Sequence, residues 1–350
     1  MRSKLNVDLL LAGFGHVARR FVVLLEESRP ALAALGIAPR VVGIATRRHG
    51  AVCDGAGLDA VRAAQVVAEG GAVGPASPPS TLECIARLRS QRAETRVLVE
   101  TTPLDVRSGE PAISHVRAAF AAGAHVITAN KGPAAFAYRA LAQEALAARV
   151  SFLFEGAVMD GIPIFSFVRE TLPAATLRAF RGVVNTTTNH ILTAIERGGP
   201  FDAALARMQA EGVAEADPSL DLDGWDAAAK TAAMANVWFD AGITPLDVRR
   251  EGLSADVAAR VHAAIAHHRR LKLVARAARQ SNGVEAAVEL RELDVDDPLA
   301  ILDGHANALE LDTWPAGRIV ITQRDSGLEK TAYALLSDLV TVARSVQQAR

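Results

Sequence analysis

Short apolar segments alternate with helical patterns through the first part of the chain. Four of them are dominated by aliphatic residues, namely 7–12, 41–45, 97–100 and 125–129. Nearly continuous apolar runs predict strands that are buried on both faces, as in a parallel sheet. Residues 16–27 and 115–122 carry apolar side chains at helical spacing and predict helices. Strands that alternate with helices indicate an α/β fold with right-handed crossovers.

The pattern changes after about residue 150. Residues 151–155 predict one more strand that leads into a glycine-rich turn, and the alanine-rich stretch 200–240 predicts helices. Residues 243–325 predict a mixture of short strands and loops. Residues 330–350 have an apolar stripe at helical spacing and predict a strong helix. A region of α+β character therefore follows the α/β region.

Composition narrows the class of protein. A chain of 350 residues suggests two or three domains. The net charge of −1 argues against a strongly basic nucleic-acid-binding protein. No apolar run reaches the roughly 18 residues of a membrane-spanning helix, and the N-terminus is a poor signal peptide. Two cysteines, Cys53 and Cys84, are too few for a disulfide framework. We expect a cytoplasmic protein that binds neither nucleic acid nor membranes.

A glycine-rich turn follows the first predicted strand. Residues 13–18 read GFGHVA, which has the form G-x-G-x-x-A and opens the first predicted helix. The first glycine permits a tight turn, the second lets the backbone approach a pyrophosphate, and the helix N-terminus offers N–H groups to the phosphates. An ordinary glycine-containing turn is the alternative. The turn predicts a dinucleotide site made by a set of five residues: Gly13, Phe14, Gly15, His16 and Val17.

The residues after the second predicted strand bear on the choice of cofactor. NAD-binding proteins carry an acidic residue there, which accepts hydrogen bonds from the ribose. This chain has Arg47 and Arg48 instead, within the sequence ATRRH. Two guanidinium groups can hold a 2′-phosphate, and no neighbouring carboxylate repels it. The pair favours NADP over NAD, with two solvated surface arginines as the alternative.

An acidic segment precedes a lysine at residues 215–230. Asp226 and Lys230 are four residues apart on a predicted helix and share one face. Several carboxylates crowd the preceding loop, and they favour the charged lysine. A positioned ammonium group can donate a proton to a developing alkoxide. An exposed ion pair beside an acidic loop is the alternative. A calcium loop is excluded because Leu222 and Ala228 occupy positions that need glycine and glutamate.

Together with five further blocks, this segment resembles homoserine dehydrogenases. The family pattern E-A-D-P-x-x-D-x-x-G-x-D-x-x-x-K matches Glu215 to Lys230. The other blocks stand in the family's order: TANKG at 128–132, EGAVMDGIP at 155–163, RGVVNTTTNHIL at 181–192, DPLA at 297–300 and SGLEKTA at 326–332. The resemblance covers essentially the whole chain. It implies interconversion of L-homoserine and L-aspartate 4-semialdehyde with NADPH or NADH, within threonine and methionine biosynthesis.

The resemblance also implies roles for individual residues. Lys230 would be the acid/base, Asp226 the partner of the substrate hydroxyl, and Lys131 would reach the substrate or relay protons near the nicotinamide. A substrate-binding set is expected from Glu215, Asp221 and Thr187, with Glu215 on the substrate ammonium. Lys131 also joins the expected cofactor set, together with Thr101, Thr102 and Gly327.

A monovalent cation such as sodium is expected near the third block. In the family, the glutamate that matches Glu155 and carbonyls of the following turn bind such an ion. The carbonyl candidates here are Val158 and Asp160, and oxygen ligands suit a hard cation. A buried glutamate that caps the turn is the alternative. Asp160 departs from the small residue usual in the family. Thr186 departs from a usual glycine, where an added Cβ could hinder approach to substrate or force another backbone angle.

The expected organisation is a cofactor domain of residues 1–150, completed by 316–350, and a substrate and dimerisation domain of 151–315. We expect no threonine-binding regulatory domain after the last block. A homodimer is implied by the resemblance alone. Two alternatives remain open: a related NADP-dependent dehydrogenase of another hydroxy or semialdehyde amino acid, kept open by Thr186, and a non-catalytic NADP-sensing regulator. Aspartate-semialdehyde dehydrogenase is rejected because neither cysteine lies in a matching motif.

Overall fold

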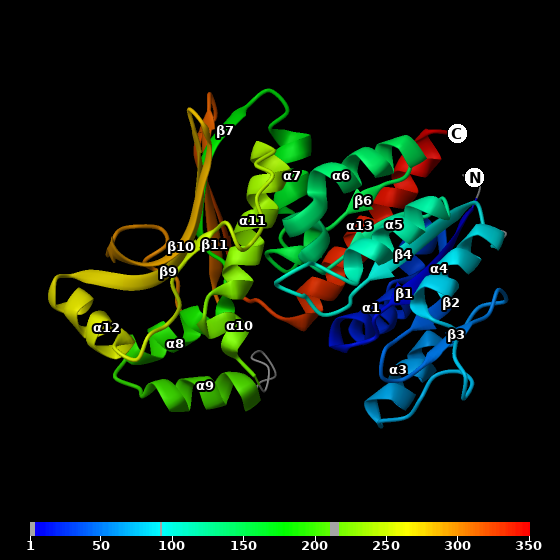
Figure 1. The fold of residues 1–350 in the computed structure, drawn as a ribbon, viewed down its shortest axis with the longest axis horizontal. Helices are drawn as coiled ribbons and strands as arrows, with labels where there is room; N and C mark the ends of the chain where they lie inside the picture. Colours follow the sequence, from blue (N-terminus) through cyan, green and yellow to red (C-terminus); the bar gives the residue numbers. More distant parts are fainter. Residues whose placement is uncertain (1–3, 92, 211–216) are drawn as a thin grey trace. The chain divides into compact units, whose positions relative to one another are not determined.

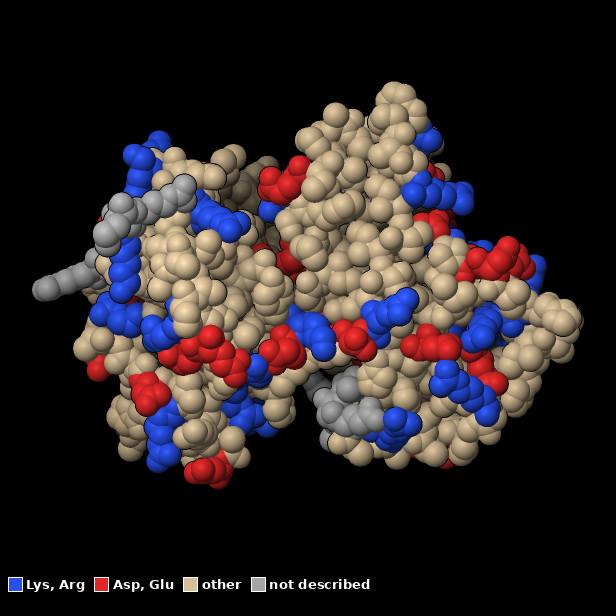
Figure 2. All heavy atoms as spheres, turned by 180° about the vertical axis from the view of Figure 1, so that it is seen from behind, with Lys and Arg blue, Asp and Glu red and all other residues tan. Residues whose placement is uncertain are grey.

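A computed structural model describes residues 4–91, 93–210 and 217–350. The chain forms two compact units (Figure 1). The first comprises Met1–Pro133, Ala137–Pro163 and Leu328–Arg350, and the second comprises Ala134–Phe136 and Ile164–Gly327. No helix among the described residues is long and apolar enough to cross a membrane. Figure 2 shows basic and acidic side chains interspersed on one face, as the small net charge leads one to expect.

The first unit contains a sheet of six strands in the order β3-β2-β1-β4-β5-β6. Its strands are β1 (Leu5–Ala12), β2 (Ile37–Ala45), β3 (Ala51–Cys53), β4 (Thr95–Glu100), β5 (His125–Thr128) and β6 (Phe152–Leu153). All neighbours pair in parallel except β2 and β3. The structure thus confirms a Rossmann-type parallel sheet. Because β1 lies between β2 and β4, the residues that follow these three strands meet at one edge.

Helices follow the strands of this unit: α1 (His16–Glu27), α2 (Arg29–Ala34), α3 (Ala60–Ala68), α4 (Thr81–Arg87), α5 (Ala112–Ala121) and α6 (Gly132–Ala148). Short 3-10 turns cover Leu88–Ser90 and Glu155–Ala157. The C-terminal helix α13 (Leu328–Gln348) packs against α1. Its Leu335, Leu339 and Val342 are buried in the same core as Phe21 of α1. The predicted helix at the C-terminus is therefore confirmed and completes this unit.

The second unit contains the other six-stranded sheet, in the order β12-β11-β7-β9-β10-β8. Its strands are β7 (Thr176–Val183), β8 (Arg249–Arg250), β9 (Arg269–Gln280), β10 (Gly283–Asp294), β11 (Asn307–Trp314) and β12 (Gly317–Gln323). All pairs are antiparallel except β10 with β8. Its helices are α7 (Ile164–Thr171), α8 (Thr186–Glu196), α9 (Phe201–Ala210), α10 (Ser219–Leu222), α11 (Trp225–Phe239) and α12 (Val257–Ala266).

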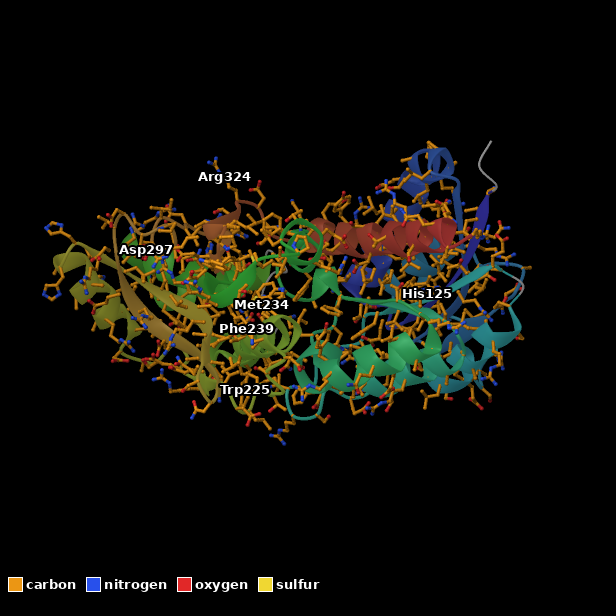
Figure 3. The ribbon with its side chains drawn as sticks, turned by 90° about the horizontal axis from the view of Figure 1, so that it is seen from above. His125, Trp225, Met234, Phe239, Asp297 and Arg324 are labelled. Atoms are coloured by element: carbon orange, nitrogen blue, oxygen red, sulfur yellow. The ribbon has the colours of Figure 1, made fainter. Side chains whose placement is uncertain are left out.

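The expectation of short strands between residues 243 and 325 is wrong. β9 and β10 each contain 12 residues and form one long hairpin. Residues 271–275 of β9 are all buried, and the charged Lys272 is among them. The aromatic side chains Phe239 and Phe180 stack with ring centroids 5.8 Å apart, which ties the end of α11 to β7; Figure 3 labels Phe239.

The units have other boundaries than the sequence suggested. Residues 151–163 lie in the first unit, because β6 pairs with β5. Residues 316–327 lie in the second unit, because β12 pairs with β11. The predicted strand 151–155 is shorter than expected, since the chain enters a 3-10 turn at Glu155.

Candidate active site

The glycine-rich turn between β1 and α1 is held tightly by its neighbours. Gly13 has a φ of +85°, and a Cβ there would lie 2.7 Å from the carbonyl carbon and oxygen of Thr101. The Gly13 N–H donates to the Ala45 carbonyl at 2.9 Å. Both the backbone angle and the contact require glycine at this position. The turn is therefore fixed between the ends of β2 and β4.

The start of α1 fits a pyrophosphate. Gly15 is the N-cap residue, no side chain caps the helix, and a Cβ on Gly15 would meet nothing within 4 Å. Open space beside the N–H groups of a first helical turn is the geometry that binds phosphate. His16 is exposed and Val17 is half-buried, whereas the Phe14 ring is buried in the core. Phe14 could therefore touch a cofactor only through its backbone.

Arg47 and Arg48 lie in the turn that follows β2, and both are exposed. The Thr46 hydroxyl donates to the Gly50 carbonyl at 3.1 Å and accepts the His49 N–H at 2.7 Å. These bonds fix the turn at the end of β2, next to the end of β1. Two cations at this place suit a phosphate on the adenosine ribose.

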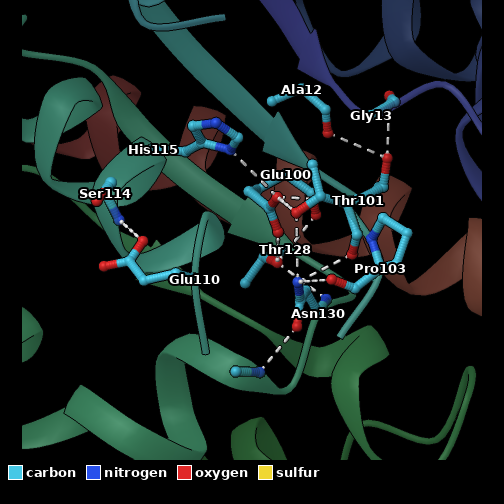
Figure 4. A network of polar contacts seen from close by, with 12 residues as sticks. Ala12, Gly13, Glu100, Thr101, Pro103, Glu110, Ser114, His115, Thr128 and Asn130 are labelled. Atoms are coloured by element: carbon cyan, nitrogen blue, oxygen red, sulfur yellow. Dashed lines mark hydrogen bonds and ion pairs between the residues drawn. The ribbon is translucent and has the colours of Figure 1, made fainter. Parts of the chain in front are cut away.

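Thr101 and Thr102 lie at the same edge, but their hydroxyl groups bind the protein (Figure 4). The Thr101 hydroxyl lies 3.1 Å from the Gly13 carbonyl and 3.3 Å from the Ala12 carbonyl. The Thr102 hydroxyl donates to the carboxylate of Glu100. These side chains position the loop after β4. Lys131 follows β5 as the N-cap residue of α6.

The expected cation site surrounds a buried glutamate. Glu155 is 5% exposed, and its backbone N–H donates to the buried carboxylate of Asp338 at 2.9 Å. Val158 is buried, and the side chain of Asp160 accepts a hydrogen bond from Thr331 at 3.0 Å. In the described part of the chain, no three His, Cys, Asp or Glu side chains form a metal-binding group. A cation here would depend on backbone carbonyls beside one carboxylate.

A polar cluster joins the starts of α8 and α11 in the second unit. Lys230 lies 3.0 Å from the Asp226 carboxylate and donates to the Val184 carbonyl at 2.6 Å. The side-chain amide of Asn185 donates to Asp221 at 2.7 Å and to Asp226 at 3.0 Å. Asn185 also caps α8 by accepting the Thr188 N–H. One side chain thus fixes the helix and both carboxylates.

Burial raises the pKa of Asp221, and the charge of Asp226 adds to the effect. Hydrogen bonds from Thr187, at 2.8 Å, and from Asn185 oppose the rise, as does the charge of Lys230. The cluster therefore sets two carboxylates against one ammonium group in a half-buried place. Such an arrangement can hold an alcohol oxygen and exchange a proton with it.

The structure locates the remaining predicted residues. Gly327 has a φ of +136° and open space where a Cβ would be. Glu215 lies outside the described residues. Thr186 begins α8, and its hydroxyl donates to Ser326 at 3.1 Å and accepts from Asn307 at 3.2 Å. Its φ is not positive, so the residue needs no special backbone angle.

Sequence reasoning gave no role to Asn185 or Glu100. Asn185 stands just before a helix and has the side chain typical of an N-cap, so this signal was present in the sequence. Glu100 ends a predicted strand and had no such signal, because two of its partners, Thr128 and His115, come from other segments of the chain.

Comparisons with known proteins point to one family. The family model described as homoserine dehydrogenase matches residues 163–340. An NAD(+)-dependent homoserine dehydrogenase of Pseudomonas canavaninivorans is 34% identical over 96% of each chain. A homoserine dehydrogenase of Methanocaldococcus jannaschii is 32% identical over 98% of this chain and 100% of its own.

Solved structures show the same fold. A homoserine dehydrogenase from Thiobacillus denitrificans superposes with a TM-score of 0.82 at 29% identity, over 98% of this chain and 74% of its own. A hyperthermophilic archaeal homoserine dehydrogenase in complex with NADPH superposes with a TM-score of 0.77 at 27% identity, over 98% of both chains.

Proposed function

The chain belongs to the homoserine dehydrogenase family, and from that premise we propose which residues carry out its reaction. It is an oxidoreductase that uses NAD(P) to convert a CH–OH group. The reaction takes L-homoserine and the oxidised cofactor to L-aspartate 4-semialdehyde, the reduced cofactor and one proton. The nicotinamide, when bound, exchanges the hydride with C4 of the substrate.

Lys230 is the acid/base in this proposal. In the direction of reduction its ammonium group donates a proton to the carbonyl oxygen, and in the direction of oxidation its neutral amine takes the proton of the hydroxyl. The observation that carries the proposal is the fixed position of Nζ, which lies 2.6 Å from the Val184 carbonyl and 3.0 Å from Asp226. A group that is already positioned loses little freedom on reaching the transition state.

The surrounding residues hold the substrate. Asp226 would accept the substrate hydroxyl, Asp221 and Thr187 would line the site, and Glu215 would bind the substrate ammonium. Asn185 keeps the two aspartates together through its side-chain amide. Lys131, at the start of α6, would bind substrate or relay a proton close to the nicotinamide.

The cofactor proposed for this chain is NADP. The glycine turn and the open N-terminus of α1 support dinucleotide binding, and the exposed Arg47 and Arg48 support the phosphorylated form. One relative is NAD(+)-dependent and one similar structure contains NADPH, so the support for NADP in this chain comes from the arginine pair.

A sodium ion beside Glu155, held also by the carbonyls of Val158 and Asp160, is a further part of the proposal. Its support is the burial of a carboxylate next to a tight turn. The family resemblance supports a homodimer and a cytoplasmic role in threonine and methionine biosynthesis. Analytical ultracentrifugation would test the dimer.

The substrate is tested by following cofactor reduction with L-homoserine, L-serine and L-threonine, each with NADP⁺ and with NAD⁺. We expect L-homoserine with NADP⁺ to have the highest kcat/KM. A chain that binds NADPH but leaves homoserine unchanged would refute the proposed substrate. It would favour an enzyme for another hydroxy amino acid, with Thr186 as the first residue to vary.

A further inference from the structure

A continuous series of hydrogen bonds runs along one edge of the first sheet, from the glycine turn to the start of α6 (Figure 4). Thr101 links the end of β4 to the glycine turn. Further along, the side-chain amide of Asn130 donates to the Thr102 carbonyl at 2.9 Å, and its oxygen accepts the Gly132 N–H at 2.8 Å. Asn130 thus joins the loop after β4 to the first residue of α6.

Glu100 lies at the centre of this series and is completely buried. One carboxylate oxygen accepts the Thr102 N–H at 3.1 Å and also the Thr102 hydroxyl. The other oxygen accepts the Thr128 hydroxyl at 3.1 Å. His115 places its Nδ1 3.6 Å from the first oxygen. The N–H and hydroxyl groups of these threonines are donors, and His115 is a possible cation, so these partners suit a buried carboxylate.

We propose that Glu100 is a positioning residue, which sets the backbone of the loop after β4 and, through Asn130, the place of Lys131. The proposal rests on the role given to Lys131 under the proposed function. The side-chain oxygen of Asn130 accepts the N–H of Gly132. Lys131 lies between these two residues and is the N-cap residue of α6. Moving the Thr102 backbone would therefore move the Asn130 amide and with it the first turn of α6.

The geometry also says which substitutions should matter. An alanine at position 100 removes the acceptor for the Thr102 N–H and hydroxyl and leaves both half-buried donors without it. A glutamine keeps one acceptor in place for Thr102. The Thr128 hydroxyl can then donate to the Glu100 backbone carbonyl, which it already approaches to 2.9 Å. An aspartate keeps the charge but is too short to reach both threonines.

The experiment compares Glu100→Ala, Glu100→Gln and Glu100→Asp with the wild type. Asp8→Ala is the matched control, because Asp8 is a buried carboxylate in the same sheet whose Arg40 ion pair, at 2.8 Å, lies outside this series. Three quantities are measured on each full-length protein: kcat with L-homoserine, the Kd of NADP⁺, and amide hydrogen exchange at Thr102 and Gly132.

Glu100→Ala should lower kcat by about 100-fold, the cost of a displaced catalytic group, while the Kd of NADP⁺ changes little because Thr101 still holds the glycine turn. Exchange at Thr102 and Gly132 should become faster. Glu100→Gln should regain most of the rate, and Glu100→Asp should not. The control should lose stability and keep its kcat.

Two results would overturn the inference. One is a Glu100→Ala enzyme with the kcat of the wild type. If that variant does not fold, a Glu100→Asp enzyme with the kcat of the wild type would overturn the inference in its place. The other is unchanged exchange at both amides. Because exchange is measured without substrate, it decides the positioning role even if the wild type fails to oxidise homoserine. That failure alone would count against the proposed function.

Discussion

Acid should destabilise the first unit through a single histidine. His125 begins β5, and its Nδ1 accepts the Ser151 N–H at 2.9 Å; Figure 3 labels the residue. Burial, with the nearby charge of Arg96, lowers the pKa of His125 from 6.5 to about 4. The neutral ring is the form that accepts this hydrogen bond, so the folded protein resists protonation where the unfolded chain does not.

The size of the effect follows from the shift. Above pH 6.5 neither state is protonated at this group, and the contribution to stability is complete. As the pH falls from 6.5 to about 4, only the unfolded chain binds the proton, so the free energy of unfolding decreases. A difference of roughly 2.5 pKa units corresponds to at most about 3 kcal/mol.

Urea denaturation at a series of pH values measures this contribution. We compare the wild type with His125→Asn, which has an oxygen that can accept the Ser151 N–H but does not titrate in this range. The free energy of unfolding of the wild type should decrease by about 2–3 kcal/mol relative to that of the variant between about pH 7 and about pH 4. The exposed His262, changed to Asn, is the control and should give parallel curves. Parallel curves for His125→Asn as well would refute the reasoning.

Three further predictions concern the cofactor and the cation. Gly13→Ala should weaken NADPH binding by at least about 10-fold in a fluorescence titration, because its Cβ would lie 2.7 Å from the Thr101 carbonyl; unchanged affinity would contradict the tight turn. Changing Arg47 and Arg48 together to Ala should lower the ratio of kcat/KM for NADP⁺ to that for NAD⁺ by about 10–100-fold, since each charge-assisted hydrogen bond contributes about 1.5–3 kcal/mol; a constant ratio would mean that the arginines are only solvated. Replacing sodium by choline at constant ionic strength should lower the rate of the wild type but not that of Glu155→Gln. A wild-type rate that does not change on this replacement would exclude the cation.

Local patterns predicted five strands of the first unit and its helices α1, α5 and α13, but not β3, α2, α3, α4 or α6. The helix predicted at 16–27 has those bounds in the structure, because a strand, two glycines and helical spacing all lie within one short segment. The C-terminal helix was predicted because its apolar residues follow helical spacing within one segment. β9 and β10 were missed although apolar residues alternate along both of them, at 271, 273, 275 and 277 and at 284, 286, 288 and 290.

The candidate site was also predicted in part, where its contacts are local in the sequence. Asp226 and Lys230 could be paired from their spacing on one helix, and the structure places them 3.0 Å apart. The link from Asn185 to Asp221 depends on how α8 and α10 fold together, which spacing along the chain does not encode. Glu100 was missed because its partners Thr128 and His115 follow from the pairing of β4 with β5 and from the packing of α5.

The most direct test of the account is the rate of homoserine oxidation by Lys230→Met, a substitution that keeps an unbranched side chain, one atom shorter, and removes its proton-transferring amine. The variant should bind NADP⁺ as the wild type does, while kcat falls by about 10²–10⁴-fold, the usual contribution of general acid–base catalysis. A variant that binds NADP⁺ normally and turns over homoserine near the wild-type rate would show that the proton passes through another group.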